Sequence, residues 1–217
     1  MTNVLILGAA GQIARLAENM LFKQKEMHLT LFVRHPKKLD DLDMDQVNAD
    51  IVVGDAANYD DVAKAVKGQD IVYANLAGED TIEQQAANVV KAMDDQGVKR
   101  LIWVSTLGIY DEVPGQFGEW NNKELDGYLQ PYAAAAKKIE DSDLDYTIIR
   151  PAWLQDKKEV NYETTQKGQE FRGTEVSRLS VASFIFDLIN DPTREVGHSV
   201  GLNKPHTDGT MPAWLKK

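Results

Sequence analysis

The sequence contains no cysteine among its 217 residues. This excludes disulfides, a thiolate nucleophile and any metal site built on cysteine. It also lacks an apolar run long enough to cross a membrane, and no signal segment precedes the first predicted strand. We therefore expect a cytoplasmic protein that does not enter a membrane.

Basic residues are fewer than acidic ones, 24 against 34, which gives a formal net charge of −10 at pH 7. Such a chain is a poor match for nucleic acid or for an anionic membrane surface, because both are polyanions. We expect a small-molecule substrate instead, bound by a monomer or a homodimer. The four histidines are scattered without metal-ligand spacing, so the sequence predicts no metal site.

No linker, composition shift or internal repeat divides the chain, so we expect residues 1–217 to form a single domain. Strand-like runs alternate with helical patterns, which is typical of βαβ units. The predicted strands cover 4–7, 29–33, 49–53, 70–75, 100–105, 146–149 and 198–202, and the predicted helices cover 13–21, 59–66, 81–96, 132–140 and 179–188. This pattern predicts an α/β fold: one Rossmann-type, doubly wound, mainly parallel sheet with helices on both faces.

The first strand and the turn after it carry the clearest motif. The apolar run 4–7 is typical of a strand buried on both faces, and Gly8 and Gly11 follow it directly before a helical pattern. A glycine turn at a helix N-terminus lets free N–H groups approach a pyrophosphate. The spacing departs from G-x-G-x-x-G, with Ala14 at the last glycine position; the alternative is an ordinary turn between strand and helix. The predicted pyrophosphate site comprises Gly8, Ala10, Gly11, Gln12 and Ile13.

The end of the second predicted strand indicates which dinucleotide binds. NAD-binding units carry an acidic residue about 20 residues past the glycines, where it bonds the ribose 2′-hydroxyl. Here that position holds Arg34, and no carboxylate follows before Asp40. An arginine suits a 2′-phosphate by its charge and its donor fork. We therefore expect NADP, with NAD possible; the alternative is that Arg34 is a solvated surface residue.

Two further turns belong to the predicted cofactor site. Asp55, after the third strand, either accepts a bond from the adenine amino group or shapes a turn. The fourth strand ends in small residues, as expected where backbone passes close to a ribose, although a plain turn has the same composition. This segment consists of Asn75, Leu76, Ala77 and Gly78.

Two segments, 106–130 and 153–178, lack a regular pattern and follow predicted strands. Open α/β sheets bind ligands at strand C-termini, so we expect both segments on the substrate side. The first does not resemble core sequence, although it contains Tyr110, Phe117, Trp120 and Tyr128. With Trp153, these aromatic residues form either a stacking platform for a planar substrate or a lid packed on itself.

Several motifs together resemble the atypical short-chain dehydrogenase/reductase proteins, in the NmrA-like, NAD(P)H-binding branch that includes flavin and biliverdin reductases. The motifs span almost the whole chain: GAAGQIA at 8–14, GDAANYDDVAKAV at 54–66, VSTLGIY at 104–110, SDLDYTIIRPAWL at 142–154 and SRLSVASFI at 177–185. The resemblance implies that Ser105 and Thr106 lie under the nicotinamide ribose. It also implies that the nicotinamide end is lined by Pro151, Ala152, Trp153 and Leu154.

The catalytic pattern of alcohol-oxidising short-chain dehydrogenases is incomplete. Those enzymes use Ser, Tyr and Lys, with the lysine four residues after the tyrosine, so that both face one cleft and the lysine lowers the pKa of the tyrosine. Here Tyr132 is followed by four alanines, and Lys137 comes one place too late. Tyr132 is therefore either catalytic or a helix-face aromatic packed on the sheet. Ser105 remains a candidate hydrogen-bond donor to a substrate carbonyl.

These observations leave three hypotheses of function. The first is an NADPH-dependent reductase whose acceptor is already electrophilic, such as a flavin or quinone, because such chemistry needs mainly alignment. The second is a non-catalytic NmrA-like sensor that binds the dinucleotide and reports its redox state. The third, a sugar-nucleotide epimerase, is disfavoured by the missing lysine.

Overall fold

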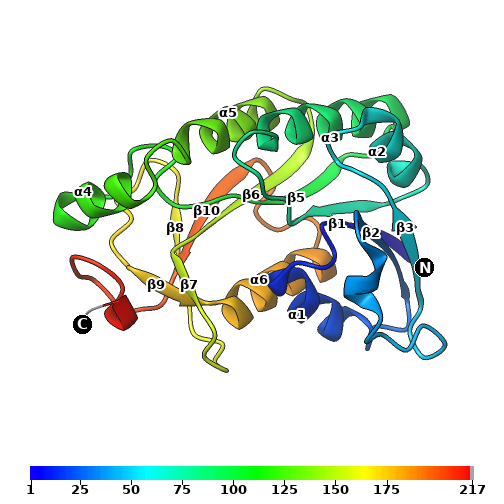
Figure 1. Ribbon diagram of the computed structural model, residues 1–217, viewed down its shortest axis with the longest axis horizontal. Helices are drawn as coiled ribbons and strands as arrows, with labels where there is room; N and C mark the ends of the chain where they lie inside the picture. The colour runs from blue at the N-terminus through cyan, green and yellow to red at the C-terminus, as the bar shows by residue number, and fades with distance from the viewer. Residues whose placement is uncertain (216–217) are drawn as a thin grey trace.

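The structure is a computed structural model that describes residues 1–215. It is built around an eight-stranded sheet (Figure 1). In spatial order the strands are β3 (Ala49–Val53), β2 (Met27–Val33), β1 (Thr2–Leu7), β4 (Ile71–Ala74), β5 (Arg100–Val104), β6 (Asp145–Pro151), β10 (His198–Asn203) and β8 (Glu163–Gln166). Neighbouring strands are parallel except at the edge, where β8 runs antiparallel to β10. The short strands β7 (Trp153–Gln155) and β9 (Glu175–Ser177) form a separate parallel pair.

Helices cover both faces of the sheet. On one face α1 (Gln12–Leu21) packs beside α6 (Arg178–Asn190); on the other lie α2 (Tyr59–Val66), α3 (Ile82–Gln96) and α5 (Leu129–Glu140) (Figure 1). The central strand β1 shows why the sequence folds this way. Val4 and Ile6 enter the core with α1 and α6, whereas Leu5 and Leu7 enter the core on the opposite face. Burial of each such side chain contributes roughly 1.5–3 kcal/mol, so the unbroken apolar run belongs to a doubly covered strand. The predicted α/β Rossmann-type fold is confirmed.

Local signals in the sequence set several boundaries. The helix α2 spans the predicted residues, and the Asn58 side chain caps it by accepting from the N–H groups of Asp60 and Asp61. Gly97 ends α3 in the left-handed region with φ of 69°, as glycine at a helix C-cap does. Strand β2 begins at Met27, two residues before the predicted start.

The two segments expected to be irregular contain regular structure. Helix α4 (Gly115–Glu124) lies within 106–130, and β7, β8 and β9 lie within 153–178. Glycine, proline and charge hide the helical pattern of α4, whose inner side includes the buried ring of Phe117. That ring joins the core, contrary to the expectation for this segment. The short strands β7, β8 and β9 were not predicted because their sequences, WLQ, ETTQ and EVS, are too short and too polar to show an apolar alternation.

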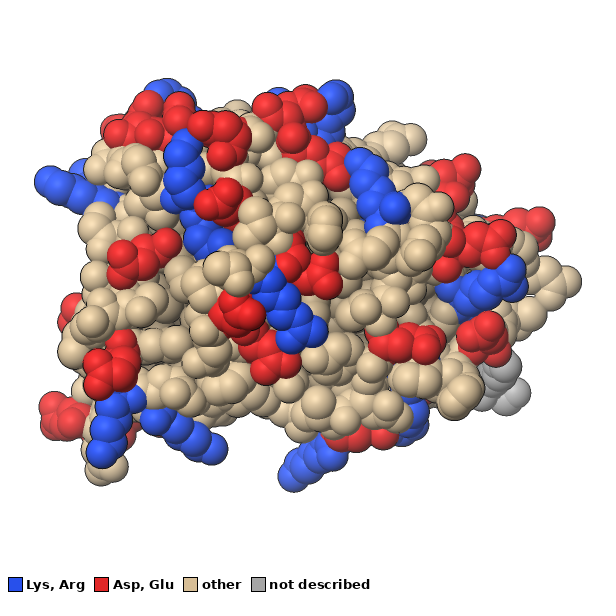
Figure 2. Space-filling view, turned by 180° about the vertical axis from the view of Figure 1, so that it is seen from behind, with Lys and Arg blue, Asp and Glu red and all other residues tan. Residues whose placement is uncertain are grey.

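The path of the chain places a crevice at the C-terminal ends of the strands, between β1 and β4. From β1 it moves outward to β2 and β3, then returns to the other side of β1 at β4. The loops after β1 and β4 therefore diverge at this switch point, where open α/β sheets bind ligands. On the reverse face, acidic and basic side chains are interspersed (Figure 2). Within residues 1–215, no helix has the length and apolar character needed to cross a membrane.

Candidate functional site

The glycine turn after β1 fits closely against the loop after β4. Gly8 has φ of +77°, and a Cβ there would lie 2.3 Å from the backbone oxygen of Asn75. A Cβ on Gly11 would lie 2.1 Å from Nδ2 of the same residue. The Asn75 backbone therefore requires glycine at position 8, whereas at position 11 a larger residue would require the Asn75 side chain to move. The place of the two glycines in the motif reflects local packing as well as space for a ligand.

The same turn leads into the N-terminus of α1. Gly11 is the N-cap, with φ of −73° and ψ of 150°, and its N–H donates to the Gly8 carbonyl at 2.9 Å. In the described chain no side chain caps this end, and its first turn carries no acidic residue. The helix therefore presents a partial positive charge and free N–H donors, which suit an anion.

One cavity, of about 290 Å³, opens where the loops after β1, β2, β3 and β4 converge. Its lining includes the predicted residues Gly8, Ala10, Gly11, Arg34, Asp55, Asn75, Leu76 and Ala77. Arg34, His35 and Lys38 supply its basic side. Among residues 1–215 neither Arg34 nor Lys38 has an acidic partner within salt-bridge distance, and both side chains are exposed. Two uncommitted cations thus stand at the end of β2.

Asp55 has a structural role in this cavity. Its Oδ1 accepts from the Ala57 N–H at 2.9 Å, and its own N–H donates to Asp61 Oδ2 at 3.0 Å. The turn alternative weighed for Asp55 is therefore present. Contact with adenine stays a prediction. Gly78, with φ of +132°, lies against the Thr81 hydroxyl and is not part of the lining of this cavity.

A second cavity, of about 220 Å³, lies at the ends of β4 and β5. It shares Asn75, Leu76 and Ala77 with the first, so the two cavities adjoin along the loop after β4 and together line a crevice over the switch point. The rest of its lining is Gln12, Ile13, Val104, Ser105, Tyr128, Tyr132, Leu154 and Arg178. The crevice therefore runs from the cations after β2 to the serine after β5.

Ser105 lines this second cavity, and its hydroxyl is buried. The residue is 7% exposed, and its backbone N–H donates to the Ile149 carbonyl at 2.8 Å. Its Oγ has no hydrogen-bond partner among the described residues. A buried, unpaired hydroxyl is costly unless a ligand completes it, so Ser105 is a good candidate for a contact with substrate or cofactor.

Two tyrosines, Tyr128 and Tyr132, also line this cavity. Tyr128 and Tyr132 stack with ring centroids 4.3 Å apart and an interplanar angle of 21°. Burial, followed by the hydrogen bond to Tyr132, raises the pKa of Tyr128 well above its ordinary value. Lys137, which would have to lower a tyrosine pKa, instead bonds Asp141 at 2.8 Å on the exposed side of α5. Lys138 pairs with Glu83 at 3.1 Å. The tyrosine–lysine arrangement is thus absent from the described site.

In the segment at the end of β6, some residues line the second cavity and others are buried in the packing. Leu154 lines the second cavity, whereas Pro151 and Ala152 are buried beside it and Thr106 is half-buried outside both linings. The Trp153 ring lies 4.8 Å from that of Trp120, measured between centroids. Its Nε1–H donates to Asn121 Oδ1 at 2.9 Å.

The other aromatic residues do not form one platform. The Phe117 and Trp120 rings stack at 6.1 Å, so α4 and β7 share an aromatic cluster packed on itself. Tyr110 lies elsewhere, with its hydroxyl donating to Glu140 at 2.7 Å. The aromatic residues expected to act together therefore lie in three places: the α4–β7 cluster, the Tyr128–Tyr132 pair and the Tyr110 site.

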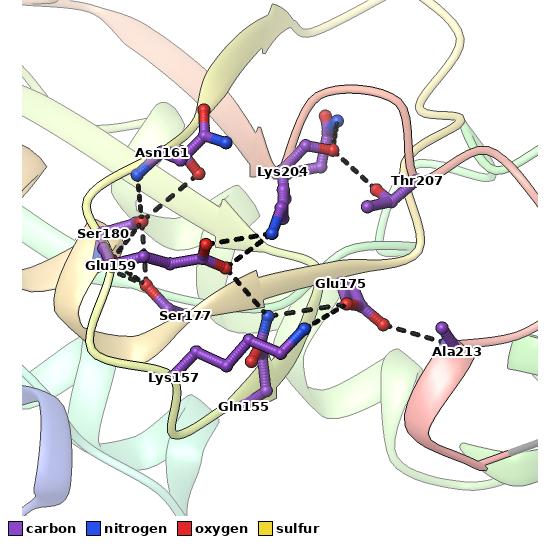
Figure 3. Close-up of polar contacts among 11 residues, drawn as sticks. Gln155, Lys157, Glu159, Asn161, Glu175, Ser177, Ser180, Lys204, Thr207 and Ala213 are labelled. Carbon is purple, nitrogen blue, oxygen red and sulfur yellow. Dashed lines mark hydrogen bonds and ion pairs between the residues drawn. The ribbon is translucent and has the colours of Figure 1, made fainter.

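Sequence reasoning missed Arg178, the first residue of α6, which lines the second cavity. A polar network fixes this helix start (Figure 3). Ser177 Oγ caps α6 by accepting from the Ser180 N–H at 2.9 Å and donates to the Glu159 carbonyl at 2.6 Å. Glu159 in turn holds Lys204 at 2.8 Å. Ser177 before an apolar helical run indicates a helix start, and therefore that Arg178 lies in the first turn. The local sequence does not indicate which cavity that helix start faces.

Lys38 and His35 were also missed. Both belong to the basic run RHPKK from 34 to 38. Lys38 lies in the short 3₁₀ helix at Pro36–Leu39, four residues after Arg34. Read as a group, that run indicates a phosphate site better than Arg34 alone.

A doubly wound sheet, a glycine turn at an uncapped helix start and a crevice at the switch point define a Rossmann-type dinucleotide-binding protein. The model of the NAD(P)H-binding family matches residues 8–192, and the chain belongs to this family. Within residues 1–215, no group of three or more metal-ligating side chains lies together.

Solved structures agree with this placement. A Rossmann-fold NAD(P)-binding family protein from Shigella flexneri is 44% identical, with a TM-score of 0.84 and 98% of each chain covered. A short-chain dehydrogenase/reductase from Veillonella parvula, solved in complex with NADP, is 30% identical, with a TM-score of 0.89 over 98% of this chain and 99% of that one. An uncharacterized sugar epimerase, YhfK, from Bacillus subtilis is 27% identical over 88% of this chain and 90% of its own.

Proposed function

We propose that the chain, acting as one domain over residues 1–217, is an NADPH-dependent reductase that passes hydride to a planar, conjugated acceptor such as a flavin or quinone. One observation carries this proposal. Two adjoining cavities place the unpaired cations Arg34 and Lys38 at one end of a crevice and Ser105, whose hydroxyl has no partner among the described residues, at the other.

The residues present fit NADPH. Arg34 and Lys38 would bind the 2′-phosphate, because both are cationic, exposed and without an acidic partner in the described chain. The free N–H groups at the start of α1 would bind the pyrophosphate. The segment 75–77, which lines both cavities, would pass beside the nicotinamide-side ribose. When bound, the reduced nicotinamide supplies hydride.

The second cavity favours an acceptor that needs no strong acid. Tyr128 stays protonated because burial raises its pKa, and neither Lys137 nor Lys138 reaches the cavity to lower that of a tyrosine. Conjugated acceptors are already electrophilic and require mainly alignment with the donor. In this scheme the Ser105 hydroxyl donates a hydrogen bond to an oxygen of the acceptor and so orients it.

A second candidate is a sensor that binds the dinucleotide without turnover. The small volume beside Ser105, about 220 Å³, and the stacked Tyr128–Tyr132 pair favour it. Sugar-nucleotide epimerisation is supported by the name of a relative, YhfK. Removing hydride from an alcohol calls for a deprotonated tyrosine, which the raised pKa of Tyr128 and the distant lysines oppose.

Calorimetric titration with NADPH and NADH tests the cofactor assignment. We expect NADPH to bind at least about tenfold more tightly, because the 2′-phosphate gains charge-assisted hydrogen bonds. Arg34→Gln and Lys38→Gln should each reduce that preference, whereas Lys37→Gln, an exposed neighbour outside the cavity lining, should not. If neither NADPH nor NADH binds, the proposal is refuted.

Consumption of NADPH with FMN, riboflavin or quinones then separates the two candidates. Turnover with any of them supports the reductase. Tight NADPH binding without turnover across the set supports the sensor.

A further inference from the structure

Arg178 is the one basic residue that lines the second cavity. The other lining groups of this cavity are neutral, and no aspartate or glutamate of the described chain is among them. A single guanidinium in an otherwise neutral cavity attracts an anionic group. The polar surroundings offered by Ser105 and the two tyrosines do not compete with it for charge.

The only acidic partner that Arg178 has among residues 1–215 lies outside the cavity. Arg178 Nη1 contacts Asp156 Oδ1 at 2.8 Å, with the arginine side chain 21% exposed and the aspartate 79% exposed. An ion pair this open to solvent stabilises the structure by at most about 1 kcal/mol. The contact is through one nitrogen, so the arginine fork retains free donors. Asp156 is thus a weak competitor that a bound anion can replace.

The backbone beneath Arg178 is held firmly, which matters for a specific contact. Figure 3 shows Ser177, Ser180 and Glu159 joined around the start of α6. Glu159 is in turn bonded by Lys204, which ties this corner to the end of β10. The arginine therefore projects from a fixed base toward the cavity, and binding an anion does not require the helix to order first.

We propose that Arg178 forms an anion subsite at the acceptor end of the crevice, selecting planar acceptors that carry a carboxylate or a similar anionic group, with Asp156 occupying the guanidinium until such a ligand binds. This inference rests on the proposed function, because it assigns the acceptor of the same site. The dinucleotide pyrophosphate is the competing source of an anion. The uncapped start of α1 already provides donors for it, so Arg178 is left for the acceptor.

A binding experiment that needs no turnover tests this. The protein is saturated with NADP, which covers the cations at Arg34 and Lys38, and is titrated calorimetrically with 2-naphthoate and with the neutral isostere 2-naphthamide. We expect the carboxylate to bind about tenfold more tightly, the gain typical of a charge-assisted hydrogen bond. Arg178→Gln should remove this preference, Arg178→Lys should restore part of it, and Asp156→Asn should increase it.

Arg172→Gln is the matched control. It removes the same charge from an arginine in another exposed pair, with Glu170, and should leave the naphthoate preference unchanged. Equal binding of the two probes by the unmodified protein overturns the inference. So does an Arg178→Gln variant that keeps the preference or that weakens NADP itself as its main effect. If NADP does not bind the unmodified protein, the proposed function fails first, and the two failures are thereby distinguished.

Discussion

Arg150 and Glu112 form an ion pair that is almost wholly removed from solvent, with the arginine at the end of β6 and the glutamate in the loop after β5. The carboxylate of Glu112 also accepts from the N–H groups of Gly108 at 3.0 Å and Tyr110 at 2.9 Å. Arg150 Nε donates to Ser199 Oγ on β10 at 3.0 Å. The pair thus fastens the loop that follows Ser105 to two neighbouring strands.

Breaking this pair should be costly. Arg150→Met leaves the Glu112 carboxylate buried without its counter-charge, and we expect the free energy of unfolding to fall by about 3–5 kcal/mol. Arg172→Met, in an exposed pair with Glu170, should change it by less than about 1 kcal/mol. Denaturant titration of both variants measures the difference, and similar losses in the two would contradict a dominant role for burial.

The two motif glycines should differ in how their substitutions can be rescued. Gly11→Ala brings a methyl against the Asn75 side chain while φ, at −73°, is ordinary. The added mutation Asn75→Ala should therefore recover much of the lost thermal stability. Gly8→Ala meets the Asn75 backbone oxygen, which that mutation cannot remove, so the double variant should stay destabilised.

Gly68 provides the control for backbone strain. It has φ of +79°, close to the +77° of Gly8, but a Cβ there would meet nothing within 4 Å. Gly68→Ala should lower the free energy of unfolding by about 1–2 kcal/mol through conformation alone. Gly8→Ala should lose clearly more. A Gly8→Ala variant as stable as Gly68→Ala would show that the Asn75 contact is unimportant.

Substitutions at Ser105 and Tyr132 should separate orientation from proton donation. Ser105→Ala removes the free hydroxyl and should lower kcat/KM for a quinone by about tenfold, the usual scale for one hydrogen bond to a partly charged oxygen. Tyr132→Phe keeps the stacked ring and should change it by less than about threefold, since the tyrosine is not required as an acid. A loss of about a hundredfold or more in Tyr132→Phe would instead indicate general acid catalysis.

Tyr128 should not contribute to the pH dependence of turnover. Burial raises the pKa of Tyr128, so this tyrosine remains protonated at every pH at which the protein would be assayed. We expect kcat/KM to show no limb from Tyr128 between about pH 6 and 9, because a tyrosine ionises there only if its pKa is lowered. A limb in this range that vanishes in Tyr128→Phe would contradict the expectation.

Glu18 should make stability depend on pH. Its carboxyl lies buried in α1, with one oxygen bonded by Arg15 at 3.1 Å and the other without a partner in the described chain. Burial raises its pKa from the ordinary 4.5 to about 7. The folded state thus holds a proton that the unfolded chain releases. The stabilisation is complete below pH 4.5 and is lost as pH rises toward 7, by up to about 1.4 kcal/mol for each pH unit.

Glu18→Gln should remove this slope and leave a more stable protein at pH 8. Glu119→Gln, an exposed residue of α4, is the matched control and should leave the slope intact. Denaturant titrations from pH 5 to pH 8 measure both. An unchanged slope in Glu18→Gln would show that the carboxyl is ionised in the folded protein.

Local sequence was sufficient for most of the fold. The run at 4–7 predicted a strand covered on both faces, and Gly8 and Gly11 predicted the turn between β1 and α1. These signals are readable because each depends on residues a few positions apart. The sequence of α4 and of the β7–β9 region carries no such local signal, so both looked irregular. In the structure α4 is a helix, and a hydrogen bond from Trp153 to Asn121 joins β7 to it.

What only the tertiary structure decided is which distant residues share the crevice. The loops after β2 and β4 bring Arg34 and Asn75 to one cavity, α6 carries Arg178 to the cavity of Ser105, and Trp153 packs on Trp120. Asn75, more than sixty positions away in the chain, occupies the space that a Cβ on Gly8 or Gly11 would need. Such placements follow from strand order and helix packing. The sequence alone determines the dinucleotide motif, and long-range packing determines which side chains face it.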